Sequence, residues 1–185
     1  MSVDLLTTEH FAVDRLPEIR SVILDVYSEV YAQDIATDPF FSLERFEERL
    51  EGHTSAPGWG CVIARVSGEH AGFTYGFTAR DGTTFTLCEN MLRTVHRGRG
   101  ISQVMHDELM SHRSEDRTQL LVRRSRPRLR ALYERWGYRH AGEKLPFPDS
   151  PLYDVMVLDL RQGSGRPGHA TSAPDSGRDH PPLPN

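Results

Sequence analysis

Apolar positions in the first third of the chain recur with helical spacing. The pattern predicts one helix that opens near Pro17 and a second that begins after the N-cap residue Ser42 and ends at Gly52. A short strand near Val3–Thr7 precedes them. The apolar stripes of the two helices consist of Ile19, Val22, Ile23, Val26, Tyr27, Val30, Leu43, Phe46 and Leu50.

The middle of the chain has the pattern of three consecutive strands. Gly60–Val66 is nearly all apolar, Phe73, Tyr75 and Phe77 alternate with smaller residues, and Thr84–Leu92 is rich in Thr, Phe and Leu. Turn signals that contain glycine separate these runs. Short turns between successive strands predict an antiparallel meander.

After Leu92 the pattern alternates between strand and helix. The predicted segments are a helix with Ile101, Val104, Met105 and Leu109 on its apolar face, a strand at Thr118–Val122, a helix from Pro127 to a closing Gly137, and strands near Tyr138–Glu143 and Tyr153–Leu160. The fold class is therefore α+β, a mixed sheet with helices packed on it.

Composition divides the chain into two parts. Its 185 residues are 37% hydrophobic and 26% charged, which is typical of one soluble globular domain. From Arg161 onward Gly, Pro, Ser and polar residues dominate, so we expect a folded domain at 1–160 and a disordered tail at 161–185.

The sequence also excludes several classes of protein. No apolar run reaches about 18 residues and the first 20 residues lack an apolar segment, which predicts no membrane span, no signal peptide and a cytoplasmic location. Cys61 and Cys88 are then expected to be reduced thiols. The histidines and cysteines show no metal-ligand spacing, so we predict no metal site.

Charge is concentrated in one block. Residues 92–139 contain 12 Lys+Arg and 5 Asp+Glu, whereas residues 1–91 contain 6 and 15. A basic block suits an anionic partner, either a phosphate-bearing cofactor or a nucleic acid bound by the Arg-rich segment 123–139. The net charge of −4 makes nucleic acid the weaker alternative, and we expect none.

The basic block contains a glycine-rich loop, Arg97–Ser102, between a strand and a helix. Glycine lets a backbone turn tightly and approach a ligand, and the N–H groups of the following helix point into such a loop. With two arginines nearby, this is a ready site for a diphosphate. By itself the hexapeptide is equally compatible with a sharp turn whose arginines are solvated.

The surrounding segment LCENMLRTVHRGRGISQVMHDEL resembles the acetyl-CoA motif of the GCN5-related N-acetyltransferase (GNAT) superfamily, Arg/Gln-x-x-Gly-x-Gly/Ala. Here the motif reads Arg97-x-x-Gly100-x-Ser102, with serine in the last position. The segment RALYERWGY at 130–138 is similar to the later family motif Leu-Tyr-x-x-x-Gly-Phe. Arg126 stands where family members often have Asn. The resemblance covers 84–160 well, whereas 1–83 match only in the order of elements.

The resemblance implies a GNAT-like acyl-CoA N-acyltransferase fold. In that fold a mostly antiparallel sheet carries helices on both faces and splays open between its fourth and fifth strands. Acetyl-CoA would be the co-substrate, with its pantetheine arm in the gap. The expected cofactor-binding residues are Met91, Leu92, Arg93, Arg97, Gly98, Arg99, Gly100, Ile101, Ser102 and Arg126. Family members are often dimers, so a homodimer is compatible with the resemblance.

Two residues are candidate catalytic groups. Strand alternation places Glu89 on the face of Phe85, Leu87 and Met91, where apolar neighbours should raise the pKa of its carboxyl group, as a general base requires. Its position before the loop also matches the general base of many family members. The alternatives are an ion pair with a nearby arginine, or a slip in alternation that exposes the carboxylate.

Tyr133 aligns with the family tyrosine that faces the CoA sulfur, which implies a role as general acid. The alternative is core packing beside Leu129 and Trp136.

The predicted function is transfer of an acetyl group from acetyl-CoA to a primary amine, with Glu89 and Tyr133 in these roles. The acidic N-terminal half favours a small cationic acceptor. A protein N-terminus or lysine as acceptor, and a CoA-binding module without catalysis, remain as alternatives. The candidate acceptor-site residues are Tyr27, Tyr31, Asp34, Asp38, Phe40, Phe41 and Trp59.

Overall fold

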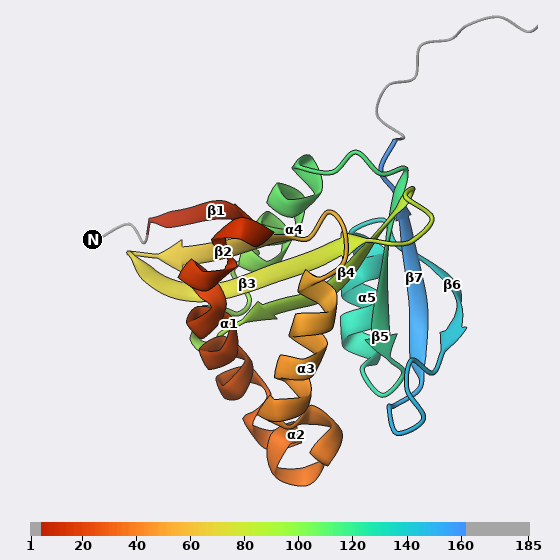
Figure 1. Cartoon of the computed structure of the whole chain (residues 1–185), viewed down its shortest axis with the longest axis horizontal. Helices are drawn as coiled ribbons and strands as arrows, with labels where there is room; N and C mark the ends of the chain where they lie inside the picture. Colours follow the sequence, from red (N-terminus) through yellow and green to blue (C-terminus); the bar gives the residue numbers. More distant parts are fainter. Residues whose placement is uncertain (1–4, 162–185) are drawn as a thin grey trace, which may run out of the picture.

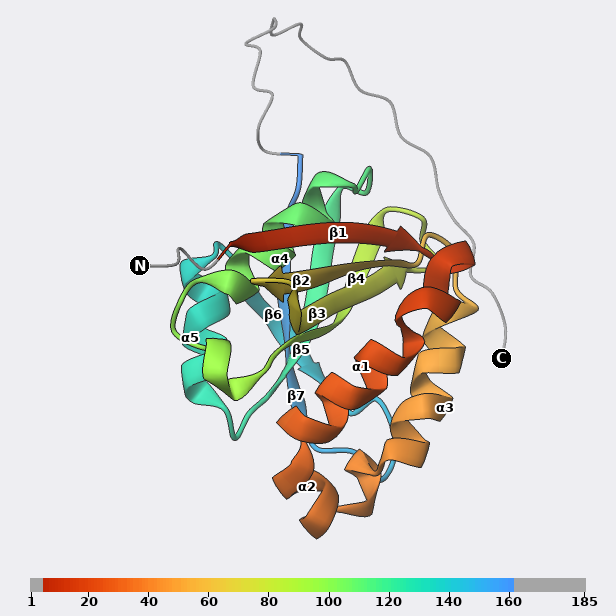
Figure 2. The same cartoon turned by 90° about the vertical axis from the view of Figure 1, so that its left-hand side faces the viewer.

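A seven-stranded sheet runs through residues 5–161, the part of the chain that this computed structural model describes. In chain order the elements are β1 (Leu6–Ala12), η1 (Val13–Arg15), α1 (Leu16–Val30), α2 (Ala32–Thr37), η2 (Pro39–Phe41), α3 (Leu43–Thr54), β2 (Gly60–Val66), β3 (Glu69–Thr78), β4 (Thr84–Leu92), η3 (Thr94–His96), α4 (Ile101–Ser111), β5 (Arg117–Arg123), α5 (Pro127–Arg135), β6 (Arg139–Lys144) and β7 (Tyr153–Asp159). Helices lie on both faces of the sheet (Figure 1, Figure 2). The predicted α+β class is confirmed.

The strand order is β1-β2-β3-β4-β5-β7-β6, and β4–β5 is the one parallel pair in the described sheet. That pair joins only Thr84–Leu87 to Arg117–Leu120, so the two strands separate beyond those residues. β1 to β4 form the predicted antiparallel meander, extended by one strand. The predicted splay between the fourth and fifth strands is therefore confirmed.

One irregularity in β4 changes which side chains share a face. Leu87 lies opposite Gly76, but Glu89 lies opposite Tyr75, which leaves Cys88 as an extra residue. Because directly opposed residues project to the same face, Glu89 shares the face of Tyr75. The prediction that Glu89 lies on the face of Leu87 was wrong, since the bulge turns it to the other side.

Two apolar clusters, one on each face, hold the sheet to its helices. The cluster under α1 and α3 includes Ile23, Val26, Phe46, Leu50, Ile63, Phe73, Tyr75 and Met91. The cluster under α4 and α5 includes Val62, Phe85, Leu87, Leu92, Met105, Leu109, Leu120 and Tyr133. β4 contributes to both clusters, so it is a strand that links the two sides of the molecule.

Local signals placed several boundaries correctly and missed others. Ser42 caps α3, since its hydroxyl accepts a hydrogen bond from the N–H of Arg45 at 3.3 Å. The prediction that Gly52 ends this helix was wrong, because the helix continues to Thr54. Val104 is 43% exposed and does not belong to the apolar face of α4, where His106 is buried instead. The short helix α2 was not predicted.

Two predictions fall partly outside the described residues. The predicted strand Val3–Thr7 overlaps β1 only at Leu6 and Thr7, and residues 1–4 are not described. From residue 162 onward the predicted tail also lies outside the described part. Within residues 5–161, the structure contains no helix with the length and apolar character needed to cross a bilayer.

Candidate active site

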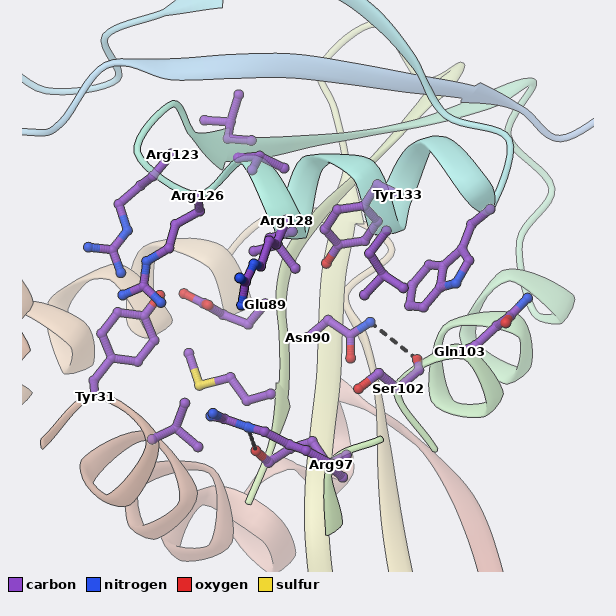
Figure 3. A pocket seen from close by; sticks show the side chains of 18 of the residues that line it. Tyr31, Glu89, Asn90, Arg97, Ser102, Gln103, Arg123, Arg126, Arg128 and Tyr133 are labelled. Carbon is purple, nitrogen blue, oxygen red and sulfur yellow. Dashed lines mark hydrogen bonds between the residues drawn. The ribbon is translucent and has the colours of Figure 1, made fainter. Parts of the chain in front are cut away.

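A cleft of about 1090 Å³ opens where β4 and β5 separate. The residues that line it come from the end of α1, α2, β4, the glycine-rich loop, the start of α4, the end of β5, α5 and Tyr153 of β7. In Figure 3, Ser102 and Gln103 lie at one end of this cleft, Tyr31, Arg123 and Arg126 lie at the other, and Glu89 and Tyr133 lie between them. The sheet thus places the two candidate catalytic residues on one continuous surface.

The loop end of the cleft is built by two glycines with left-handed backbone. Gly98 has φ +75° and Gly100, the N-cap of α4, has φ +76°. Side chains other than glycine rarely adopt such a conformation. Gly100 accepts hydrogen bonds from the N–H groups of Gln103 and Val104, so the N–H groups of Ile101 and Ser102 have no acceptor within the helix. This arrangement can bind an anion through free N–H groups and the helix dipole.

Most of the predicted cofactor residues line the cleft. They are Met91, Leu92, Arg97, Gly98, Gly100, Ile101, Ser102 and Arg126. The side chain of Arg97 donates from Nε to the main-chain oxygen of Leu92 at 3.4 Å, which holds its guanidinium beside β4.

Arg93 and Arg99 are not among the residues that line the cleft. The guanidinium of Arg93 pairs with Asp25 and Glu29 of α1, and its main-chain N–H donates to Ala71 at 2.9 Å. Arg93 is therefore occupied in joining α1 to the sheet. The structure therefore does not place the side chain of Arg93 in the cleft.

Glu89 lines the cleft on the side of α1 and α3. Burial raises the pKa of its carboxyl group to about 7, and the charges of Arg49 and Arg123 act in the opposite direction. The carboxyl group makes no hydrogen bond or ion pair within residues 5–161. Near neutral pH it therefore exists in both protonation states, which is the condition for accepting a proton from an amine.

Tyr133 of α5 approaches the cleft from the opposite face of the sheet. Its side chain is 7% exposed, and its ring meets Trp136 and Tyr138 edge to face at centroid distances of 5.2 and 5.5 Å. Burial and the charge of Glu89 raise the pKa of its hydroxyl group, which therefore stays protonated at physiological pH. The residue both packs in the core and presents a proton donor to the cleft.

Asn90 is a cleft residue that sequence reasoning missed. Its Nδ2 donates to the main-chain oxygen of Ser102 at 3.2 Å, and its side chain lies close enough to Tyr133 to lower the pKa of that hydroxyl. Its Oδ1 atom is buried without a partner in the described structure. Only the β4 bulge puts Asn90 on this face, so alternation in the sequence gave no signal for it.

The other end of the cleft contains an ion cluster. Arg123 donates from Nη1 to Oδ1 of Asp34 at 2.8 Å, and Arg126 donates from Nη2 to Oδ2 of the same carboxylate at 3.4 Å. Asp34 was a candidate acceptor-site residue, but Arg123 was not singled out. The residues around Arg123 in the sequence do not indicate its ion pair with Asp34, because the two residues are 89 positions apart.

Comparisons with known proteins agree with this geometry. The family model of the acetyltransferase (GNAT) domain matches residues 24–148. The fold is similar to the aminoglycoside 6′-acetyltransferase type Ii, at 17% identity and TM-score 0.63 over 87% of this chain and 99% of that chain. It is also similar to the PaiA N-acetyltransferase from Thermoplasma acidophilum in complex with coenzyme A, at 13% identity and TM-score 0.57 over 84% and 99%.

A third similar structure is the spermidine/spermine N-acetyltransferase SpeG from Vibrio cholerae, in mutant form, at 14% identity and TM-score 0.57 over 85% of this chain and 96% of that chain. A search of the curated proteins found no match. The family model spans more than half of the sequence, and the splayed sheet and the glycine-rich loop are both present. The chain belongs to the GNAT family and is an acyl-CoA-dependent N-acetyltransferase.

Proposed function

We propose that the protein transfers the acetyl group of acetyl-CoA to the primary amine of a small molecule, by direct attack of the amine on the thioester. Glu89 is the general base and Tyr133 the general acid. The observation that carries the proposal is that one cleft contains a carboxyl group with a pKa of about 7 and a phenol that stays protonated. Groups whose pKa values are moved apart by their surroundings are suited to opposite proton-transfer roles.

The loop end of the cleft is the proposed site of the CoA diphosphate. The free N–H groups of Ile101 and Ser102 and the guanidinium of Arg97 supply donors and positive charge there. Met91 and Leu92 lie at the separated edge of β4, beside which the pantetheine arm would run. When bound, the donor supplies an activated thioester.

The residues of this chain then handle two protons. Glu89 accepts a proton from the attacking nitrogen while the nitrogen–carbon bond forms. Tyr133 donates its phenolic proton to the sulfur as the carbon–sulfur bond breaks, and the products are an amide and the CoA thiol. Asn90 helps to orient Tyr133, since its side chain lies beside the phenol and is anchored on Ser102.

The choice of a small molecule as acceptor is supported by the relatives. The similar structures include an aminoglycoside acetyltransferase and a spermidine/spermine acetyltransferase by name. At 17% identity or less, however, this likeness concerns the fold.

The test of the proposal is the Glu89→Gln variant. Removal of a general base should lower kcat by about 100-fold or more, because general acid–base catalysis contributes about 10²–10⁴-fold. Release of CoA thiol with an accepted amine measures kcat, and calorimetric titration with acetyl-CoA measures binding, which should stay within about twofold of the wild type. Glu48→Gln, on the exposed side of α3, is the matched control. An unchanged kcat in Glu89→Gln would remove Glu89 from the mechanism.

A further inference from the structure

The end of the cleft beyond Glu89 holds two guanidinium groups that share one carboxylate. Arg123 and Arg126 both donate to Asp34, at 2.8 and 3.4 Å. The charged residues that line this end of the cleft within the described chain are Arg123, Arg126, Arg128, Asp34 and Glu89, and Figure 3 places Arg128 beside Glu89. Since Asp34 is already bound on both oxygens, it offers little to an additional cation.

A further guanidinium, that of Arg49, influences Glu89 without lining the cleft. The charge of Arg49 lowers the pKa of the Glu89 carboxyl group, which shows that the two side chains are electrostatic neighbours. Arg49 itself donates to the main-chain oxygen of Phe40 at 3.1 Å and to the hydroxyl of Tyr27 at 3.4 Å, both neutral groups. In the lining itself, the three positive charges of Arg123, Arg126 and Arg128 face the two carboxylates of Asp34 and Glu89, and Glu89 is the proposed base.

Arg123 is held in a fixed plane. Its guanidinium stacks on Phe41 at 4.6 Å and on Tyr31 at 5.6 Å, and its side chain is 14% exposed. In the described structure it makes one side-chain hydrogen bond, from Nη1 to Asp34. The remaining donors of a planar fork match the two oxygens of a carboxylate.

Acidic residues elsewhere in the N-terminal half do not compensate for this positive end. Several of them are paired with arginines away from the cleft: Glu9 with Arg15 and Arg65, Glu47 with Arg20, and Asp25 and Glu29 with Arg93. Part of the acidic excess that led us to expect a cationic acceptor is therefore used in ion pairs on the surface and around α1. A polyamine would bring further positive charge to a region that is already positive.

We propose that the acceptor is a primary amine that also carries a carboxylate, as an amino acid does, with its amine at Glu89 and its carboxylate at the Arg123–Arg126 pair. This inference rests on the proposed function, since it uses the same cleft and the same base. The aliphatic and aromatic side chains of Val30, Tyr31, Leu121 and Tyr153 line this part of the cleft and would contact the rest of the acceptor.

Matched pairs of acceptors test the inference, because an amino acid and its amide differ by one negative charge and almost nothing in size. Rates are compared at equal concentrations of neutral amine, since the amine of the amide has the lower pKa. The protein is assayed for release of CoA thiol with the common amino acids, with their amides, and with spermidine. We expect the best acid to have a kcat/KM at least about tenfold above that of its amide, since a hydrogen bond to a charged group contributes about 1.5–3 kcal/mol. Spermidine should be the poorest acceptor.

Variants locate the preference. The side chain of Arg126 is 52% exposed, so the Arg126→Gln variant should fold. It should reduce the ratio of kcat/KM for the acid to kcat/KM for the amide several-fold. Arg123→Gln combined with Asp34→Asn removes the Arg123–Asp34 ion pair without leaving an unpaired buried charge, and adding Arg126→Gln to this variant should bring the ratio close to one. Arg124→Gln is the matched control, because Arg124 lies next in sequence but pairs with Glu143 at 3.1 Å, away from the cleft.

The outcomes separate the two proposals. If amides or spermidine are acetylated as well as the acids or better, the carboxylate inference is overturned and the acetyltransferase mechanism stands. If no amine leads to release of CoA thiol, the proposed function fails. Thermal unfolding of the protein with acetyl-CoA and either the acid or the amide then tests the carboxylate site independently of catalysis. A larger rise in the unfolding midpoint with the acid supports the carboxylate site, and equal rises overturn it.

Discussion

Glu89 lies opposite Tyr75 in the register of β3 and β4, whereas Leu87 lies opposite Gly76, and the extra residue between them is Cys88. This bulge decides which face of the sheet Glu89 and Asn90 each occupy at the level where β4 and β5 separate. Glu89 therefore lies on the face covered by α1 and α3, the side of the proposed acceptor, and Asn90 meets Ser102 and Tyr133 on the other side. Bulges commonly re-aim a side chain next to an active site.

The pKa of Glu89 predicts the pH dependence of the reaction. Because burial raises this pKa to about 7, the base is mostly protonated below that pH. We expect the ratio of kcat/KM in the wild type to that in Glu89→Gln to fall about tenfold for each pH unit below about 7 and to level off above it. Initial rates of thiol release from about pH 5.5 to pH 8.5 measure the profile. The Glu89→Gln variant lacks the ionisation of Glu89, so the pH profile of its residual rate shows the ionisation of the amine alone. If the wild type and Glu89→Gln had the same pH profile, the assignment of Glu89 as general base would be contradicted.

The same pKa predicts a stability effect. A carboxyl group whose pKa is raised from about 4.5 in the unfolded chain to about 7 in the fold favours folding when protonated, and that contribution is lost as the pH rises through this range. Glu89→Gln cannot ionise, so it should be more stable than the wild type at about pH 8, by up to about 3 kcal/mol, and gain little at about pH 4.5. Thermal or urea unfolding at both pH values measures the difference. A gain of equal size at the two pH values would show that ionisation of Glu89 is not the cause.

Tyr138 provides a matched control for Tyr133, the proposed proton donor. Both are buried on the same face, but Tyr133 lines the cleft whereas the hydroxyl of Tyr138 lies 2.8 Å from Nε2 of His106. We expect Tyr133→Phe to lower kcat by about 10²-fold with little change in KM. Tyr138→Phe should keep its kcat and lose about 1 kcal/mol of stability with its hydrogen bond. Thiol-release kinetics and thermal unfolding measure both variants, and equal kcat values for the two would assign Tyr133 to packing alone.

Arg97 provides a test of the anion site. Arg97→Glu reverses a charge beside the loop, so the dissociation constant for acetyl-CoA should rise by about tenfold or more. Arg80→Glu makes the same change at an exposed turn between β3 and β4 and should leave binding unaltered. The rise in the unfolding midpoint with increasing acetyl-CoA concentration measures both. If Arg97→Glu retained the wild-type response, the diphosphate would have to bind elsewhere.

Much of the fold could be predicted from local sequence. Gly60–Val66 and Thr84–Leu92 were placed to the residue, because β-branched and aromatic runs bounded by turn residues are strong strand signals. Ser42 and Pro17 marked helix starts because the signal and its effect lie within one turn. The helix α2 was missed, since its six residues are too few to show a periodic pattern.

The sequence by itself determined most of the elements and the glycine-rich loop of this protein, because the backbone of Gly98 and Gly100 and the first turn of α4 depend on residues only a few positions apart. The tertiary structure alone decided which face Glu89 occupies and which carboxylate binds Arg123. Both depend on contacts between distant segments, one on the register of β4 against β3 and the other on α2 packing beside the end of β5. Local alternation does not encode such contacts, since a one-residue shift in register turns a side chain to the other face.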